Sequence, residues 1–179
     1  MVCRECLLSG HMSAPLHTVE VRFVDLLYHH VLIQRNQTWD PAGFWRKSPL
    51  CAIGLTVSLG HSGSACPYPT PPSSMVVFHT NGLHSVNVRF CGCGADITGT
   101  QRYIQLLRMN WHPATQSQPA TAFTTEVLDL FHALTVQGKL SAHDYYQGIM
   151  RLQDGTGTQS RVVRIWLPIN YMQSVLTTC

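Results

Sequence analysis

Hydrophobic residues form short runs in the first part of the chain and helically spaced stripes after about residue 100. The run Leu55–Leu59 predicts a strand, and a loop rich in glycine, proline and serine follows from Gly60 to Ser74. Two more apolar runs, 75–79 and 85–90, flank Asn81-Gly82. Asn-Gly between apolar strands predicts a β-hairpin with a type I′ turn, in which both central residues have positive φ.

The later part of the chain predicts helices. Apolar residues at helical spacing predict a first helix with the members Tyr103, Ile104, Leu107 and Trp111. A break with two prolines covers residues 112–120. A second amphipathic stripe then consists of Val127, Leu128, Phe131 and Leu134. Gly138 is suited to the C-terminus of that helix.

A further helix is predicted directly after it. Ser141 and Asp144 have the spacing of a capping box. The buried face of this helix is expected to include Tyr145, Ile149 and Leu152. We therefore expect residues 124–153 to form a helical hairpin in the core, and residues 162–171 are compatible with one more strand.

Composition narrows the class of protein. A length of 179 residues suits one domain with room for a small module. Charged residues make up only 12%, and the net charge of +3 comes without a run of lysine or arginine, so there is no strong nucleic-acid signature. No apolar run approaches the roughly 20 residues of a membrane span, and no signal-peptide core follows Met1. Seven cysteines are an odd number for a secreted disulfide framework, so we expect an intracellular protein with reduced thiols.

Three of these cysteines predict a metal site. If the strand before Cys91 is extended, the side chains of Cys91 and Cys93 point to the same side, and glycines at 92 and 94 let the backbone curl around one ion. The preceding loop would bring Cys66, and His61 with it, alongside. Thiolates and imidazoles in a tetrahedral array are the ligands that Zn²⁺ prefers. The alternative is a metal-free set of buried cysteines, which pack as small hydrophobes.

A second zinc pattern lies at the N-terminus. Cys3, Cys6, His11 and His17 follow the spacing C-x2-C-x4-H-x5-H, which suits a small zinc knuckle. The alternative is a pair of thiols in a frayed terminus. Of the remaining cysteines, Cys51 is expected to be a buried thiol and Cys179 a terminal one.

Enzymatic signatures are absent from the sequence. No glutamate follows a histidine in the H-x-E pattern of zinc deaminases, and no H-E-x-x-H occurs. Two-metal chemistry needs converging carboxylates, whereas Glu126, Asp129 and Asp144 fall on predicted helices, where solvated or capping roles are expected. The scattered residues Arg89, Arg102, Arg108, Lys139 and Arg151 are either a weak phosphate-contacting face or dispersed solvated charges.

Several blocks occur in an order that resembles a known family. They are LGHSGSACP at 59–67, TNGLHSVNVRFCGC at 80–93, WHPAT at 111–115, FT at 123–124 with VLDLFH at 127–132, and QGKLS at 137–141. Together they resemble the CxC-type cysteine cluster associated with Kyakuja-Dileera-Zisupton (KDZ) transposases, over about residues 44–157. The segment 1–20 is similar to the B-box-like zinc element that can precede this cluster.

The resemblance implies a noncatalytic, zinc-binding module of a nuclear mobile-element protein. Cys66, Cys91 and Cys93 match the family's cysteines, and His61, or alternatively His84, would be the fourth ligand. In full-length members a transposase domain with an RNase H-like fold lies downstream. The module would contact DNA or protein. The alternatives are a protein-interaction adaptor without nucleic-acid binding and a truncated transposase that lacks its catalytic domain.

We therefore expect an α+β protein in which a small zinc-stabilised β-hairpin region precedes a helical hairpin. The expected divisions are a partial B-box-like element at 1–20, an irregular or inserted segment at 21–43, the cysteine cluster domain at 44–157 and a tail outside the family at 158–179. We expect neither a membrane partner nor a small-molecule substrate.

Overall fold

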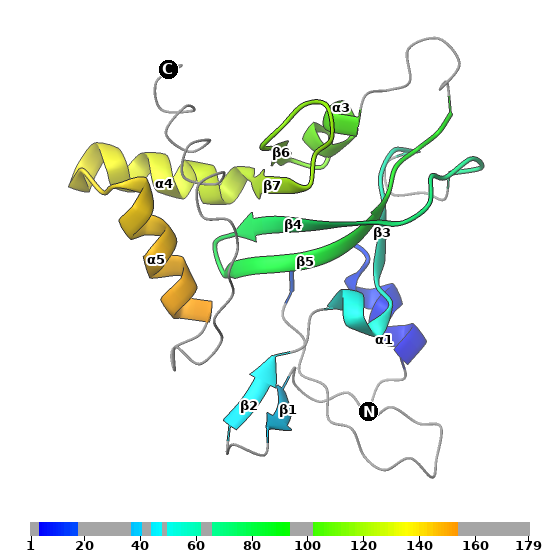
Figure 1. Cartoon of the computed structure of the whole chain (residues 1–179), viewed down its shortest axis with the longest axis horizontal. Coiled ribbons are helices and arrows are strands. Elements are labelled where there is room, and N and C mark those ends of the chain that lie inside the picture. The colour runs from blue at the N-terminus through cyan, green and yellow to red at the C-terminus, as the bar shows by residue number, and fades with distance from the viewer. Residues whose placement is uncertain are drawn as a thin grey trace. The chain divides into compact units, whose positions relative to one another are not determined.

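The structure is a computed structural model that describes residues 4–17, 37–40, 44–47, 50–61, 66–93 and 102–153. Its elements follow one another in the order shown in Figure 1: α1 (Arg4–His11), β1 (Gln37–Asp40), β2 (Phe44–Lys47), the 3-10 helix η1 (Leu50–Ile53), β3 (Thr56–Ser58), β4 (Ser73–His79), β5 (Gly82–Arg89), α3 (Arg102–Leu107), β6 (Trp111–Pro113), β7 (Thr121–Thr124), α4 (Thr125–Gly138) and α5 (Ala142–Gln153).

Strands and helices combine into an α+β architecture, as the sequence predicts. β1 and β2 form an antiparallel pair, and the other strands form a five-stranded sheet in the order β3-β5-β4-β7-β6. This sheet is mixed, because β3 pairs with β5 and β4 with β7 in parallel, whereas β6 and β7 are antiparallel. By its internal contacts the chain divides into two compact units: Met1–Ser74 with Ser85–Cys93, and Met75–His84 with Gly94–Cys179.

The first unit contains β3 and the part of β5 from Ser85 onward. The strand predicted at Leu55–Leu59 is confirmed as β3, whose Val57 lies opposite Val88 of β5. Alternate positions of the chain are buried, as expected where one face of a strand packs inward. The buried hydrophobic residues of this unit are Leu16, Leu50, Leu55, Val57, Leu59, Val86, Val88 and Phe90. Cys91 and Cys93 follow directly after the end of β5 at Arg89, so this packed strand positions the segment that carries them.

The predicted hairpin is present as β4 and β5, but its turn differs from the expectation. Thr80 and Asn81 form the turn, and Gly82 is already the first residue of β5. Among these three residues only Gly82 has positive φ, at 134°. The expected type I′ turn with positive φ at both Asn81 and Gly82 is therefore wrong. The φ of 134° favours glycine at this position, and a Cβ there would also lie 2.6 Å from Cδ of Gln153, so that this side chain would have to shift.

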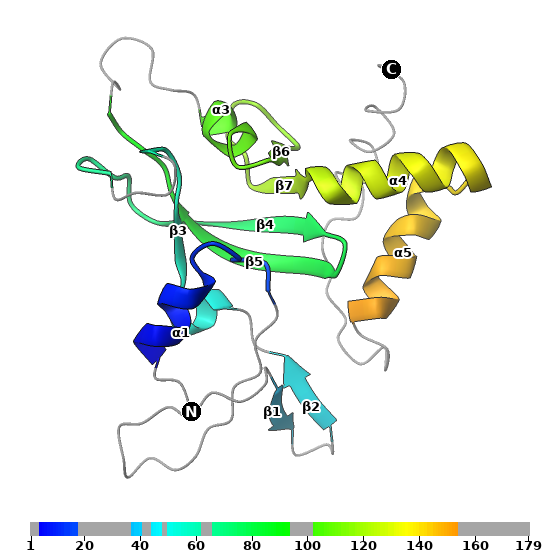
Figure 2. The same ribbon diagram turned by 180° about the vertical axis from the view of Figure 1, so that it is seen from behind.

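In the second unit, the helix expected to include Trp111 ends earlier. α3 stops at Leu107, Asn110 adopts a left-handed conformation with φ 58°, and Trp111 begins β6 opposite Thr124 (Figure 2). The backbone N–H of Thr125 donates to the carbonyl of Asn110 at 3.0 Å, which ties this reversal to the start of α4. Trp111 is buried by its place beside β7 and not by a helical stripe. Pro113 is tolerated in β6 because β6 is the edge strand.

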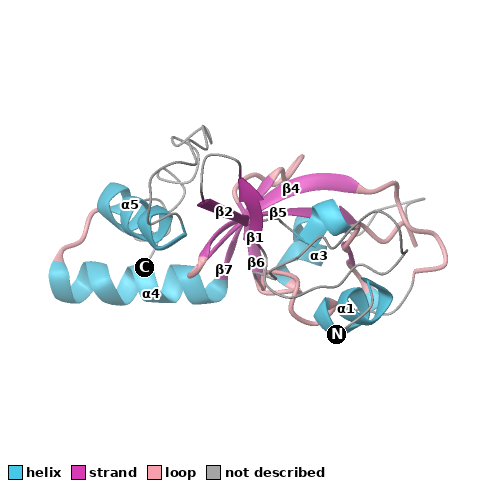
Figure 3. Cartoon of the chain, turned by 90° about the horizontal axis from the view of Figure 1, so that it is seen from below, coloured by secondary structure: helices cyan, strands magenta, loops and turns pink. Residues whose placement is uncertain are grey.

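The predicted helical hairpin is confirmed as α4 and α5, joined by a short loop (Figure 3). Thr124 caps α4 by accepting the N–H of Val127 at 3.4 Å. One half of the expected capping box of α5 is present, since Ser141 Oγ accepts the N–H of Asp144 at 3.1 Å. In return the Asp144 carboxylate accepts the Ser141 hydroxyl at 2.6 Å, where a full capping box uses the backbone N–H. At the end of α4 the left-handed residue is Lys139, with φ 52°, and not the glycine at 138.

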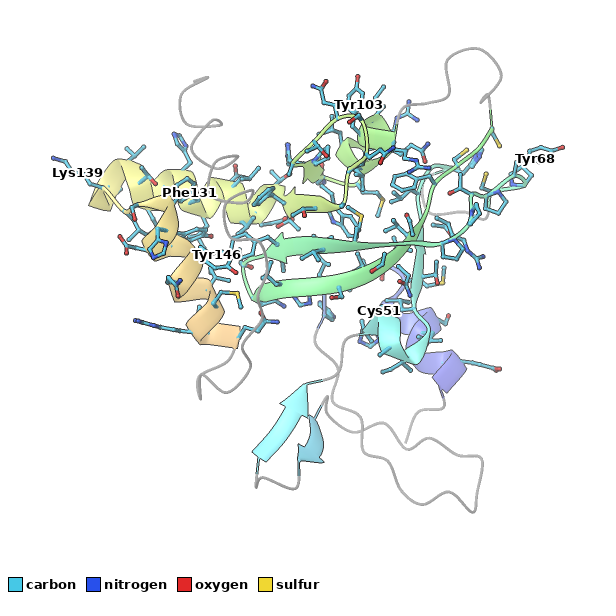
Figure 4. The ribbon with its side chains drawn as sticks, viewed as in Figure 1. Cys51, Tyr68, Tyr103, Phe131, Lys139 and Tyr146 are labelled. Atoms are coloured by element: carbon cyan, nitrogen blue, oxygen red, sulfur yellow. The ribbon has the colours of Figure 1, made fainter. Side chains whose placement is uncertain are left out.

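The hairpin packs on the sheet through one apolar cluster. Its buried residues are Phe78, Leu83, Phe123, Val127, Leu128, Phe131, Ala142, Tyr145, Tyr146 and Ile149. The expected burial of Leu134 and Leu152 is wrong, because these side chains are 40% and 73% exposed. Burial of Tyr145 raises its pKa to about 12, and its hydroxyl donates to the carbonyl of Val127 at 3.1 Å. Figure 4 shows Phe131 on α4 and Tyr146 on α5 within this cluster.

The side-chain amide of Gln153, at the end of α5, forms two hydrogen bonds with the backbone of β5, as the backbone of a neighbouring strand would. Its Oε1 accepts the N–H of Leu83 at 3.0 Å, and its Nε2 donates to the carbonyl of Leu83 at 2.9 Å. Replacing Gln153 by Ala is expected to lower the free energy of unfolding by about 2 kcal/mol, since each such bond contributes about 1 kcal/mol and its loss leaves backbone groups to be resolvated. Urea titration measures this.

The matched control is Gln137→Ala, which removes an exposed glutamine side chain from α4. We expect this change to stay within about 0.5 kcal/mol, as for other surface substitutions. Equal losses for the two variants would show that the paired amide of Gln153 contributes nothing to stability.

Candidate metal centre

The cysteine segment is held by a short antiparallel pairing with the loop before β4. Pro69 and Cys91 form an isolated β-bridge. The N–H of Thr70 donates to the carbonyl of Phe90 at 2.9 Å, and the N–H of Gly92 donates to the carbonyl of Tyr68 at 2.8 Å. This register places Cys66, two residues before Tyr68, beside the end of β5. The loop and the C-x-C segment therefore approach each other by backbone pairing.

His61 reaches the same place from the end of β3. The N–H of Leu59 donates to the carbonyl of Arg89 at 2.8 Å, which extends the pairing of β3 with β5 by one residue. Gly60 and His61 then both have positive φ, at 84° and 47°. A left-handed conformation is readily adopted by glycine and only rarely by other residues. The chain reverses here, and the imidazole of His61 comes beside Cys91.

Three sulfur atoms and one imidazole nitrogen converge. Sγ of Cys66 lies 3.4 Å from Sγ of Cys91 and 3.5 Å from Sγ of Cys93. Nε2 of His61 lies 3.3 Å from Sγ of Cys91. All four donor atoms are within 4.8 Å of one another. The thiols are half-buried and His61 is exposed, so the site is near the surface.

These separations fit a four-coordinate metal ion. With metal–sulfur bonds of about 2.3 Å and metal–nitrogen bonds of about 2.0 Å, the donors of a regular tetrahedron lie about 3.5 to 3.8 Å apart. Three of the six donor separations at this site, 3.3 to 3.5 Å, are close to those edges, and all six are within 4.8 Å. They are far from the sulfur–sulfur bond of about 2.05 Å in a disulfide. The cluster can therefore bind a metal ion through four protein atoms.

Gly92 has a steric role between the two cysteines. A Cβ at this position would lie 2.6 Å from the carbonyl oxygen of Tyr68, a distance that real Cβ atoms do not reach. Its φ is not in the left-handed region, so the expected curling of the backbone at Gly92 is not the reason for glycine there. Glycine is required because the backbone of the Tyr68 loop packs directly against it. Gly94 lies outside the described residues.

Gly92→Ala is therefore expected to push the Tyr68 loop away and move Cys66 from its two partners. The affinity for a metal ion should fall by about 10- to 100-fold, the range found when groups that orient metal ligands are lost. Competition with a chromophoric chelator measures the change. The control is Gly148→Ala in α5, where nothing lies within 4 Å of the added Cβ and stability should rise by about 0.5–1 kcal/mol. Unchanged affinity in Gly92→Ala would contradict the steric argument.

Hydrogen bonds around the sulfur atoms shift the pKa values of two thiols in opposite directions. Desolvation favours the neutral thiol of Cys66, but hydrogen bonds from the backbone of Tyr68, the thiols of Cys91 and Cys93 and the backbone of Gly92 outweigh it and lower its pKa to about 6. The pKa of Cys93 rises to about 11, first through its hydrogen bond with Cys66 and then through desolvation. Cys91 in turn accepts the N–H of Cys93 at 3.3 Å. The proton is therefore lost more readily from Cys66 than from Cys93.

The alternative ligand His84 is not part of this group. Its Nε2 lies 2.6 Å from Oδ1 of Asn81 at the hairpin turn, and its ring centroid lies 6.4 Å from that of His79. His61 is the histidine that the structure brings to the three thiols. Tyr68, whose backbone supports Cys66, was not anticipated from the sequence. Its position between Pro67 and Pro69 is a sequence signal, because a residue before proline is biased to an extended backbone.

The N-terminal pattern is only partly within the described residues. Cys6 is exposed on α1, and the rings of His11 and His17 meet edge-on with centroids 5.8 Å apart. Cys3 lies outside the described residues, as does the strand expected at 162–171. In the part of the chain that the structure describes, no group of three or more possible ligands includes Cys6, His11 or His17. The zinc knuckle expected there stays a prediction.

Comparison with known protein families identified a match to this chain. Residues 50–157, more than half of the chain, match the family described as CxC2-like cysteine cluster associated with KDZ transposases. Neither the curated proteins nor the solved structures contain a match. Among the described residues, every helix is too short or too polar to span a bilayer.

Proposed function

Because this chain belongs to the family of CxC2-like cysteine clusters associated with KDZ transposases, we propose that it is a noncatalytic zinc-binding module that contacts DNA in the nucleus. The observation that carries the proposal is the convergence of His61, Cys66, Cys91 and Cys93 within 4.8 Å. Thiolates are soft ligands that select Zn²⁺ over the hard cations Mg²⁺ and Ca²⁺. Bound there, Zn²⁺ would supply folding energy and crosslink the loop to the end of β5.

A structural role is favoured by the number of protein donors. A closed site with four protein ligands has no open position for water or substrate, whereas catalytic zinc sites keep one. The carboxylates on the helices do not converge on this site, since Glu126 and Asp129 are exposed on α4 and the Asp144 carboxylate accepts a hydrogen bond from the hydroxyl of Ser141 at the start of α5. These observations support a module that acts by binding a partner and not through an active site of its own.

Metal analysis of the purified full chain tests the zinc assignment. We expect one Zn²⁺ per chain at this site, with a second only if the N-terminal pattern also binds. Cobalt substitution should give the absorption of a tetrahedral site with sulfur ligands. A chain that takes up no zinc or cobalt after reduction would refute the assignment.

Contacts to DNA are supported by exposed basic side chains. They are Arg89, Arg102, Arg108, Lys139 and Arg151. If they touch phosphates, the affinity for a duplex should fall steeply with salt, with a slope in log Kd against log salt of about 0.9 per contact. Fluorescence anisotropy of a labelled duplex measures this slope. Arg108→Ala should lower it by about 1, and Glu126→Ala should leave it unchanged.

The second candidate is a protein-interaction adaptor without nucleic-acid binding. It is favoured by exposed apolar residues on the helical hairpin, namely Leu130, Leu134, Val136 and Leu152. The first three lie on α4 and the fourth on α5, and contiguous exposed apolar surface is typical of protein contacts. Duplex binding that is absent at low salt would favour the adaptor over the DNA-contacting module.

A further inference from the structure

We propose that the thiol cluster is also a reversible oxidation site, at which a peroxide joins Cys66 to Cys91 or Cys93 in a disulfide. This inference rests on the proposed function, because the same sulfur atoms would be the zinc ligands. Oxidation would therefore switch the module from a metal-binding form to a metal-free, disulfide-linked form.

Geometry makes Cys66 the pivot of the reaction. Its Sγ lies 3.4 Å from that of Cys91 and 3.5 Å from that of Cys93. Closing either gap to the disulfide length of about 2.05 Å needs an approach of about 1.4 Å. Adjustment of side-chain torsions covers such a distance when the backbones are already adjacent. Cys51, in η1, does not belong to the cluster and serves as the comparison thiol.

Backbone pairing between segments 66–70 and 90–93 would hold them together while the disulfide forms. Tyr68 and Thr70 are bonded to Gly92 and Phe90 on either side of the Pro69–Cys91 bridge. The new covalent bond would thus connect segments whose register is already set. The three thiols are half-buried and not enclosed, so a small oxidant can reach them.

The chemistry balances with hydrogen peroxide as the oxidant. The Cys66 thiolate attacks one peroxide oxygen, the O–O bond breaks, and the leaving hydroxide takes a proton to become water. The resulting sulfenic acid on Cys66 is attacked by the sulfur of Cys91 or Cys93, and the S–S bond forms as a second water leaves. Two thiols and one peroxide thus give one disulfide and two waters. A thiol reductant reverses the change by exchange through a mixed disulfide.

The disulfide would remove two of the four donors. Both joined sulfur atoms lose the negative charge with which a thiolate holds a metal ion. One thiol and the imidazole of His61 would remain, which is too few protein ligands for a structural zinc site. Oxidation and retention of the ion are therefore mutually exclusive at this cluster.

The test uses the full chain in a Cys51→Ser background. Trypsin cleaves after Lys47, Arg89 and Arg102, so Cys66 and the C-x-C pair fall on different peptides, 48–89 and 90–102. Removing Cys51 leaves Cys66 as the one thiol on its peptide. The zinc content is measured first. The loaded chain is then treated with hydrogen peroxide, and zinc release is followed with a chromophoric chelator while non-reducing mass spectrometry maps the disulfides.

We expect release of one equivalent of zinc, the crosslinked peptide pair 48–89 with 90–102, and recovery of binding after reduction. Cys66→Ser in the same background should abolish this crosslink even in the metal-free chain. Zinc that stays bound under peroxide, a Cys91–Cys93 disulfide as the main product, or irreversible sulfinic acid would each overturn the proposal. Failure of the chain to take up zinc before oxidation would refute the proposed function itself. That result is distinct from the outcomes that would overturn the oxidation proposal alone.

Discussion

Chelation of the metal from the zinc-loaded chain is expected to unfold the segments around His61, 66–70 and 90–93 while leaving the helical hairpin folded. All four ligand residues belong to one compact unit, and the cluster around Phe78 belongs to the other. Among the described residues next to the ligands in sequence, the large buried side chains are Leu59 and Phe90. Structural zinc binding contributes about 10–16 kcal/mol in small metal-binding peptides, far more than two buried side chains can supply.

Amide hydrogen exchange measures this effect at named groups. The N–H groups of Thr70 and Gly92, which pair the loop with the cysteine segment, should lose protection on chelation. The N–H groups of Val127 and Tyr145, at the starts of α4 and α5, should keep theirs. Unchanged protection at Thr70 and Gly92 would show that backbone pairing holds the site without metal.

A single ligand change should reproduce the loss. Cys66→Ser removes the thiol whose sulfur lies 3.4 and 3.5 Å from the other two. We expect zinc affinity to fall by more than about 100-fold, because losing a residue that only orients a ligand already lowers affinity by up to about 100-fold. Cys51→Ser is the matched control, since it makes the same chemical change at a half-buried cysteine outside the cluster. Competition with a chelator of known affinity measures both. Equal affinities in the two variants would exclude Cys66 as a ligand.

Phe78→Ala is expected to lower the free energy of unfolding by about 3–5 kcal/mol, the usual cost of removing a buried phenylalanine. Phe78 is fully buried, and its ring meets those of Phe123, Tyr145 and Tyr146 at centroid distances of 6.1, 6.4 and 5.6 Å. The substitution therefore removes the ring through which β4 packs against β7 and α5. A domain has about 5–15 kcal/mol in total, so this loss takes a large part of it.

Tyr68→Ala is the control for that experiment. It also truncates an aromatic side chain to alanine, but Tyr68 is 72% exposed and points away from the sheet (Figure 4). We expect its effect to stay within about 0.5 kcal/mol. Denaturant titration followed by circular dichroism compares the two. A loss below about 1 kcal/mol in Phe78→Ala would mean that the cluster repacks around the space.

Features that depend on near neighbours in the chain could be predicted. The capping box of Ser141 and Asp144 acts across three residues, and β3 follows from one apolar run. The partnership of Cys66, Cys91 and Cys93 was also predictable, because a hairpin returns the chain to the loop it left. The first two relations act within a few residues and the third follows from the hairpin, although Cys66 and Cys91 are 25 residues apart, and the tertiary structure altered none of them.

Features that depend on a distant neighbour were decided by the tertiary structure. Trp111 fits a helical stripe in sequence, yet pairing with Thr124 places it in a strand. Leu134 and Leu152 continue their stripes but lie beyond the area that the sheet covers. His61 and His84 are equivalent by residue type, and only the reversal at Gly60 brings His61 to the thiols.

By itself, then, the sequence determined the α+β class, the helical hairpin and the identity of the three thiols. The tertiary structure decided which histidine joins them, why residue 92 is glycine, and which apolar positions are buried. The physical reason is the range of the interactions. Caps and periodicity act within a few residues, whereas the carbonyl of Tyr68 against Gly92 and the imidazole of His61 beside Cys91 join segments that only the folded backbone brings together.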